Sequence, residues 1–334
     1  MPTNLTLSDD VQTRPFRDRL TPRVRITLVA IVLALAIAAY LFLFMTGRFS
    51  FVFPRRLTMI GAMGIAAFAQ AVGTVLFHTV TANRILTPSI MGFDAMYTLM
   101  QTLLVFFLGG EILAATDGIG KFVAQTVLMV ALATLLYRWL FSGSKSSLHV
   151  LLLVGVVLGM AFSSLSTFLQ RILSPSDFDQ LISRLYGRMS NADAEFFPVA
   201  FAVIVVVGIL VWRRRYRLDV LLLGRDPAIS LGVNHKRELT FLLVLVAILI
   251  ALSTALVGPM TFFGFLVAML AYQLTGSHEH RFVLPMAFLL GFGTLVIGQF
   301  IIQHVFYAAG YLTVIIEFVG GIAFLWILLR KGTL

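Results

Sequence analysis

Apolar runs of about 20 residues alternate with short polar segments along most of this 334-residue chain. A helix needs about 20 predominantly apolar residues to cross the hydrocarbon core of a bilayer. The alternation therefore predicts an all-α integral membrane protein with about ten spans. The predicted spans are residues 26–45, 57–79, 90–108, 122–141, 148–169, 196–212, 239–257, 262–274, 282–305 and 311–329. Span 57–79 is rich in small residues and is expected at the centre of the bundle, whereas the short span 262–274 favours a broken or partly buried helix.

The basic residues are distributed unequally over the polar segments, and this predicts the orientation of the chain. Loops with an excess of Lys and Arg stay in the cytoplasm. The excess lies in the first 25 residues, in residues 212–237 and at the C-terminal end. Both termini are therefore predicted to be cytoplasmic. Residues 1–25 would form a tail, residues 26–334 a single transmembrane domain and residues 174–195 an external, partly helical segment.

Arg55 and Arg56 form a basic pair on the predicted outer side, where the charge distribution rule disfavours them. Their position indicates a use beyond topology, such as contact with an acidic partner. Anchoring to lipid headgroups is the alternative.

The polar segment 212–237 carries seven Lys and Arg residues between two apolar runs. Asp226 followed by Pro227 is typical of a helix start with the aspartate as N-cap, and Gly232 is typical of a helix end. The pattern predicts a short helix over residues 227–231. Its apolar side chains would dock a cytosolic partner; a plain surface turn between two spans is the alternative.

Composition narrows the possible function. Hydrophobic residues make up 59% of the chain and charged residues 12%, which excludes a soluble globular protein, where about a quarter of residues are charged. The formal net charge of +10 would suit nucleic acid, but basic residues in a membrane protein serve topology and contacts with lipid headgroups, so no nucleic acid partner is expected. Cysteine is absent, and no nucleotide-binding motif or metal-ligand spacing occurs. We expect no enzyme, no catalytic or metal-binding residue and no bound cofactor.

Polar residues inside the predicted spans are candidates for function, because such residues are costly in a bilayer. Glu317 lies mid-span, which suits either a pore or a contact between helices, whereas Asp94 is expected near the hydrated inner face. His280 is expected to be solvated in a loop. Four hydroxyl residues could line a hydrophilic path or could instead bond to their own helix backbone. They are Ser163, Ser164, Ser166 and Thr167.

Three motifs together resemble those of the FecCD-type permeases, the membrane subunits of ATP-binding-cassette importers for iron–siderophore complexes, haem and cobalamin. The first runs from Pro54-Arg55 to the loop Asn-Arg-Ile-Leu-Thr-Pro-Ser-Ile-Met-Gly at 83–92. The second, Leu-Leu-Leu-Gly-Arg-Asp-Pro-Ala-Ile-Ser-Leu-Gly-Val at 221–233, is the most specific. The third is Val-Gly-Pro-Met-Thr-Phe-Phe-Gly-Phe at 257–265.

Two departures refine the resemblance. The family usually has proline-histidine where Ala268-Met269 stand, and Asn-Pro where Asn83-Arg84 stand. The first loop and residues 317–321 are more similar to the subgroup that serves catecholate siderophores such as petrobactin, anguibactin and enterobactin. Members of that subgroup usually pair with a second, different permease.

The resemblance implies a type II importer permease fold in the bacterial cytoplasmic membrane. The implied partners are a second, paralogous permease subunit, a cytosolic ATPase dimer that uses ATP and Mg²⁺, and an external substrate-binding protein. This chain would hydrolyse nothing and would move substrate by alternating access. A coupling helix within residues 221–233 would enter the ATPase. The implied coupling residues are Gly224, Arg225, Asp226, Pro227, Ala228, Ile229, Ser230, Leu231 and Gly232.

Family permeases also meet glutamates of the binding protein with external arginines. Arg55 matches one such position. Val52 and Gln303 stand at positions where other family members carry arginines, and Arg56 could be used in their place. An ion-gradient-driven secondary transporter is the alternative function, which Glu317 and the short span fit. A membrane scaffold without transport activity is a further alternative.

Overall fold

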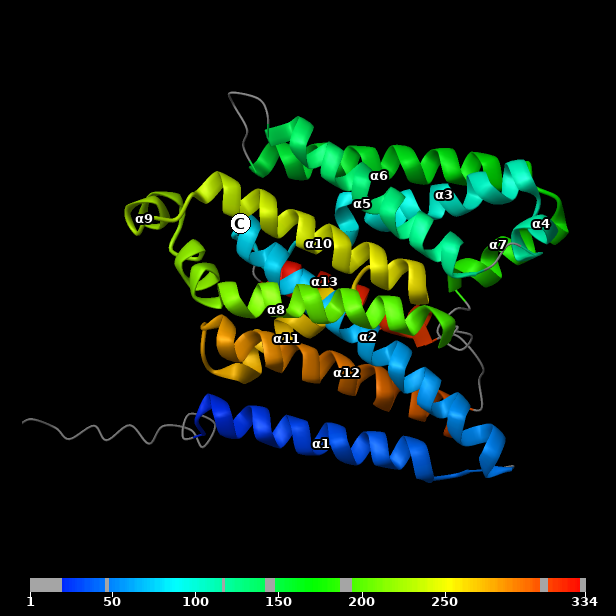
Figure 1. Ribbon diagram of the computed structural model, residues 1–334, viewed down its shortest axis with the longest axis horizontal. Coiled ribbons are helices and arrows are strands. Elements are labelled where there is room, and N and C mark those ends of the chain that lie inside the picture. The colour runs from blue at the N-terminus through cyan, green and yellow to red at the C-terminus, as the bar shows by residue number, and fades with distance from the viewer. Residues whose placement is uncertain are drawn as a thin grey trace, which may run out of the picture.

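A computed structural model describes residues 20–45, 48–115, 118–141, 148–186, 194–306 and 312–330, and every regular element within them is a helix (Figure 1). The longer helices are α1 (Pro22–Phe42), α2 (Phe49–Thr81), α3 (Phe93–Leu108), α5 (Ile119–Phe141), α6 (Leu148–Gln170), α8 (Phe197–Leu221), α10 (His235–Val257), α11 (Phe263–Thr275), α12 (His280–His304) and α13 (Leu312–Arg330). The shorter elements are η2 (Ser89–Met91), α4 (Gly110–Ala115), α7 (Pro175–Tyr186), η4 (Ala194–Phe196) and α9 (Arg225–Ser230).

The expected class, an all-α membrane protein, is confirmed. Six helices in the described residues are long and apolar enough to cross a bilayer, namely α1, α2, α6, α8, α10 and α12. Shorter apolar helices lie within α3, α5, α11 and α13. The number of about ten spans and the cytoplasmic position of both termini stay predictions. Most of the predicted tail, the inner loop 142–147 and residues 331–334 lie outside the described residues.

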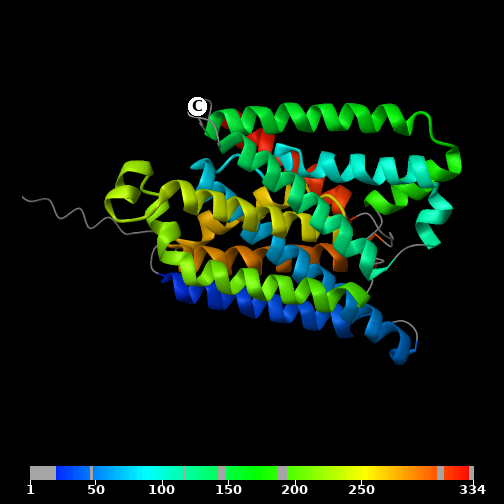
Figure 2. The same cartoon turned by 45° about the horizontal axis from the view of Figure 1, so that its top comes forward.

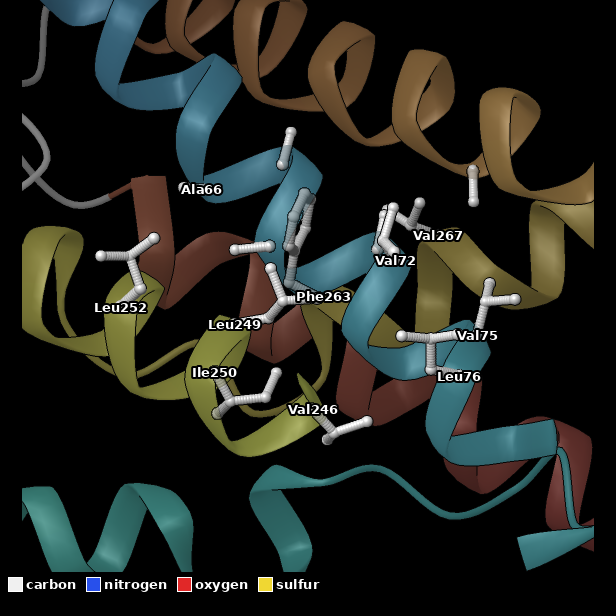
Figure 3. Close-up of a cluster of buried hydrophobic side chains, with 14 of the residues drawn as sticks. Ala66, Val72, Val75, Leu76, Val246, Leu249, Ile250, Leu252, Phe263 and Val267 are labelled. Carbon is white, nitrogen blue, oxygen red and sulfur yellow. The ribbon is translucent and has the colours of Figure 1, made fainter. Parts of the chain in front are cut away.

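The centre of the bundle is formed by α2 and α10, whose apolar windows are 83% and 78% buried. Gly and Ala on α2 let the two backbones approach closely; a methyl group added at Gly73 would lie 3.2 Å from Ile250 Cδ1. In the close-up of Figure 3, Leu249 and Ile250 of α10 point into the same cluster as Val72 of α2 and Val267 of α11. Helix association in lipid depends on such packing. The predicted central position of span 57–79 is therefore confirmed.

Three helices at the periphery are mostly uncovered by the rest of the chain. Only 11% of the apolar window of α1 is buried, and 22% of those of α6 and α8. In Figure 2, α1 and α8 run along one flank of the bundle, and in both views α6 runs beside α3 along the opposite flank. Exposed apolar faces of this extent suit lipid or another membrane subunit.

The C-terminal end of α1 is held by Arg56. Helix α2 begins at Phe49 rather than at residue 57, so Arg56 lies inside the helix and is only 4% exposed. Its guanidinium donates hydrogen bonds to the carbonyl oxygens of Tyr40 at 2.6 Å, Leu43 at 2.8 Å and Phe44 at 3.1 Å. The last carbonyls of a helix lack partners within it and form the negative end of its dipole. Arg56 therefore caps α1 and is not available to the external partner that we expected it to contact.

The N-terminal end of α1 is also held by an arginine. Arg25 lies in the first turn of α1, and its Nη1 donates to the carbonyl oxygen of Leu274 at 3.2 Å. Leu274 belongs to the last turn of α11. The two arginines thus attach a largely uncovered helix to the bundle at both ends.

Replacing Arg56 with alanine should destabilise the protein by about 3 kcal/mol, because hydrogen bonds to charged groups contribute about 1.5–3 kcal/mol and the carbonyls would lose their donor. Thermal unfolding of the purified protein in mild detergent should show this as a lower midpoint. Arg55→Ala is the matched control, because Arg55 is exposed one residue away. Equal midpoints for the two variants would contradict the capping role.

The absence of cysteine from the chain allows a direct test of orientation. Ser230→Cys in α9 should react with an impermeant maleimide only after spheroplasts are opened, whereas Ser176→Cys in α7 should react in intact spheroplasts. The reason is that the basic-residue distribution puts these segments on opposite sides. Both serines are exposed in the structure. Labelling of Ser230→Cys in intact spheroplasts would overturn the orientation.

Candidate functional site

The first candidate site is on α9, which joins the end of α8 to the start of α10 and projects beyond both helices (Figures 1 and 2). Its apolar side chains lie in two environments. Ala228 is fully buried against the chain itself, whereas Ile229 is 52% exposed and Leu231 is 62% exposed. Leu223, just before the helix, is exposed as well. We call the exposed residues Leu223, Ile229 and Leu231 the coupling surface.

The beginning of α9 differs from the prediction. The helix begins at Arg225 rather than at residue 227, and its N-cap is Gly224, whose φ of 101° is accessible mainly to glycine. No side-chain cap bond is made, so the prediction that Asp226 caps the helix is wrong. Asp226 lies in the first turn instead, where its charge suits the positive end of the helix. Ala228, predicted to face a partner, is instead fully buried in the hydrophobic core of the chain itself.

The end of α9 is as predicted. Gly232 has a φ of 80°, and its N–H donates to the carbonyl of Ile229 at 2.9 Å. The N–H of Val233 donates to the carbonyl of Ala228 at 2.9 Å. These two bonds form a Schellman motif, which satisfies the last carbonyls of a helix. The coupling surface is therefore held in a fixed orientation relative to α10.

A chain of polar contacts connects the C-terminal end of α8 to α12 and α2. The carboxylate of Asp219 accepts the backbone N–H of His280 at 2.8 Å and lies 2.7 Å from its Nδ1. The Nε2 of His280 lies 2.8 Å from the hydroxyl of Thr79. His280 is buried, so the expectation of a solvated histidine is wrong. Asp219 and Thr79 lie 61 and 201 residues from His280, so no local sequence pattern indicated this contact.

The two intramembrane acids meet through a threonine. Thr261 precedes α11; its hydroxyl donates to Asp94 Oδ2 at 2.8 Å, and its backbone N–H donates to Glu317 Oε1 at 3.1 Å. Asp94 is buried, contrary to the hydrated position expected for it, and Glu317 is half-buried. Of the two roles left open for Glu317, the structure shows the contact between helices. No sequence pattern singled out Thr261, because its partners lie on α3 and α13.

The four hydroxyl residues of α6 separate into two groups. Ser166 is buried and lies 2.9 Å from the hydroxyl of Thr102 on α3, so it joins two helices. Ser163, Ser164 and Thr167 are exposed. The hydroxyls of Ser164 and Thr167 donate to carbonyls one turn earlier on α6, at 2.9 Å and 2.8 Å. The alternative role, a hydrogen bond to the backbone of the same helix, is thus observed for two of the four residues. Both side chains are nevertheless exposed at the surface.

The predicted external segment is partly helical, since α7 covers residues 175–186; residues 187–193 lie outside the described residues. The Asp177 carboxylate accepts the N–H of Gly110 at 2.8 Å and the hydroxyl of Ser174 at 2.7 Å. These bonds favour the charged form and hold the pKa of Asp177 below its usual range. Arg55 is exposed on α2. Among the described residues, no group of three or more His, Cys, Asp or Glu side chains is placed to hold a metal ion.

Two bacterial proteins show high similarity to this sequence. The petrobactin import system permease protein FatC of Bacillus anthracis is 46% identical over 283 residues, which cover 85% of this chain and 80% of FatC. The petrobactin import system permease protein YclO of Bacillus subtilis (strain 168) is 36% identical over 286 residues, which cover 86% of this chain and 91% of YclO. Both alignments extend over most of the two chains compared.

The fold is also similar to that of a solved transporter. A metal-chelate type ABC transporter in an inward-facing conformation matches with a TM-score of 0.79 over 93% of this chain and 100% of the other. The identity is 20%, so this likeness concerns the fold. The FecCD transport family matches residues 24–330, nearly the whole sequence. This chain therefore belongs to the FecCD transport family.

Proposed function

We propose that this protein is the permease subunit of an ATP-binding-cassette importer that carries ferric complexes of catecholate siderophores into the bacterial cytoplasm, with petrobactin as the first substrate to test. The observation that carries the substrate assignment is the 46% identity with FatC. The exposed and rigidly held α9 supports a function that depends on a cytosolic partner. The protein is a multi-pass protein of the bacterial inner membrane, and it is not itself an enzyme.

The coupling surface would enter a groove on the cytosolic ATPase, as a short helix with an apolar face does in other complexes. Arg225, which is exposed, would meet acidic residues at the rim of that groove. ATP and Mg²⁺ would be used by the ATPase alone. Movement of α9 would reach the centre of the bundle through Asp219, His280 and Thr79, because these side chains connect α8 to α12 and α2.

The translocation path would run along the exposed face of α6. Ser163, Ser164 and Thr167 offer hydroxyl groups there, which suit passage of a bulky, oxygen-rich siderophore without tight binding. Ser166 is excluded from the path by its burial between α3 and α6. Glu317 would border the path from α13, where it is half-buried.

Two further subunits would complete the outer and membrane parts of the importer. A second, different permease is supported by FatD, another Bacillus anthracis protein named as a petrobactin import permease, which is 24% identical to this chain over 280 residues. An external binding protein would dock on Arg55, whose side chain is exposed and basic. A secondary transporter is not favoured, because the chain belongs to the FecCD transport family and FatC and YclO are named as permeases of petrobactin import systems.

Replacing Ile229 and Leu231 together with serine should uncouple ATP hydrolysis from transport. Truncating a central apolar contact weakens binding by about 1–2 kcal/mol, so the pair should lower affinity for the ATPase by at least tenfold. Uptake and substrate-stimulated ATPase activity, measured in proteoliposomes that contain all subunits, should fall together. Both residues are exposed, so the permease should still fold.

Ser230→Ala is the matched control on the same helix, because the Ser230 hydroxyl bonds only within α9, to the carbonyl of Asp226. Normal coupled uptake by the double serine variant would sink the assignment of the coupling surface. Ala228→Glu is unsuitable as a test, because a charge at this buried position would disturb the packing of α9 on the permease itself.

Reversing the charge at Arg55 should weaken docking of the binding protein by about five- to tenfold, mainly through slower association, because exposed charges at an interface steer the encounter. The effect should shrink as salt is added. Surface plasmon resonance on the reconstituted importer measures both. Arg171→Glu makes the same charge change at another exposed position that we expect on the outer side. If Arg55→Glu and Arg171→Glu weaken docking equally, the effect comes from the overall charge of the outer surface, and Arg55 is not a specific contact.

A further inference from the structure

A cavity of about 780 Å³ lies between the end of α8, the start of α10 and the link that joins α9 to α10, and Leu231 of the coupling surface is part of its lining. The lining combines basic and apolar side chains. The charged residues of the lining are Arg214, Arg217, Arg237 and Glu238, and the apolar ones include Val220 and Phe241. We call this cavity the inner arginine pocket.

The single acid of the pocket is already paired. Glu238 is buried, and both of its carboxylate oxygens accept from Arg214 Nη1 at 2.7 Å. The Arg214 guanidinium also lies 3.9 Å from the centre of the Phe241 ring, which fixes its position further. Arg214 therefore makes its main contacts within the protein, with Glu238 and Phe241.

The other two arginines are only partly compensated by this acid. Glu238 also forms an ion pair with Arg217 at 3.7 Å, but 60% of the Arg217 side chain is exposed. Arg237 is exposed as well. Three arginines against one glutamate leave a net charge of two positive units in the lining. A guanidinium presents paired N–H donors that match the oxygens of a phosphate group.

Aromatic residues place the pocket at the depth of lipid headgroups. Trp212 and Tyr216 are exposed on α8, and Tyr216 also lines the pocket. The Arg215 guanidinium lies 4.8 Å from the Trp212 ring and 4.4 Å from the Tyr216 ring. Exposed Trp and Tyr mark the interface between headgroups and hydrocarbon. On the part of α8 that precedes Trp212, the exposed side chains are large and apolar, which suits contact with lipid acyl chains. They are Phe201, Val205, Val206 and Ile209.

We propose that the inner arginine pocket binds the phosphate-bearing headgroup of an anionic phospholipid of the cytoplasmic leaflet. Arg217 and Arg237 contact the phosphate, and Val220 and Phe241 pack against the glycerol and the first carbons of the acyl chain. Basic pockets between transmembrane helices on the cytoplasmic side are suited to this ligand. The bound lipid joins the inner ends of α8 and α10, the two helices from which α9 projects. The inference does not depend on which substrate the importer carries.

The test measures lipid binding rather than transport, so it is separate from a test of the proposed function. The full-length protein, delipidated in mild detergent together with any subunits that co-purify, is titrated with phosphatidylglycerol, and bound lipid is counted by native mass spectrometry. Arg217→Gln with Arg237→Gln should weaken binding about 25-fold, since each basic residue near an anionic lipid contributes about fivefold. Phosphatidylcholine should bind weakly to both proteins.

The matched control is Arg213→Gln with Lys236→Gln, which removes the same charge from exposed neighbours outside the pocket lining. The control should bind phosphatidylglycerol as the unaltered protein does. Equal binding by both double variants would overturn the proposal. Displacement of the lipid by millimolar inorganic phosphate would assign the pocket to a free anion and overturn the lipid assignment. A third outcome is that Arg217→Gln/Arg237→Gln binds lipid normally but no longer co-purifies with the ATPase. This result would assign the pocket to protein contact and would also overturn the lipid proposal.

Discussion

Close approach of helix backbones is the constraint on which the rest of this structure depends. Lipid tails are as apolar as the helices they surround, so burial of apolar surface does not drive the helices together, and contact must come from fitted packing. Gly and Ala on α2 allow that fit to α10, and Gly264 of α11 packs directly on Thr74 of α2. The tightly packed centre formed in this way is the frame against which α1, α6 and α8 are positioned.

Polar contacts are concentrated where helices begin and end. Arg56 caps α1, Asp219 bonds to the first residue of α12, and Thr261 bonds to acids of two other helices just before α11 begins. Unsatisfied backbone groups and hydration are both found at helix ends, so charges there cost less than they would in the middle of a span. One of these contacts, that of Asp219 with His280, connects α8, which leads into α9, to α12.

The sequence predicted most of the helices and the exposed α9, because apolar runs and basic segments are local features. Its errors concern side chains whose partners lie far away in sequence. Arg56 resembled a surface charge because its four acceptor carbonyls belong to the preceding helix and its link. Asp226 resembled a cap because Asp-Pro is a frequent start signal, but the positive φ of Gly224 allows an earlier start. His280 resembled a solvated loop residue because its partners are 61 and 201 residues away.

The attachment of α1 at both ends has a consequence for the synthesis of the protein. Arg25 bonds to Leu274, 249 residues later in the chain, so α1 is synthesised long before the partner of its N-terminal end exists. A helix with so little buried surface loses little stability while it lies in lipid alone, and α2 supplies Arg56 soon afterwards to hold the C-terminal end. Insertion of α1 and its final docking are therefore separate events in biogenesis, and the second is completed only when α11 has been translated.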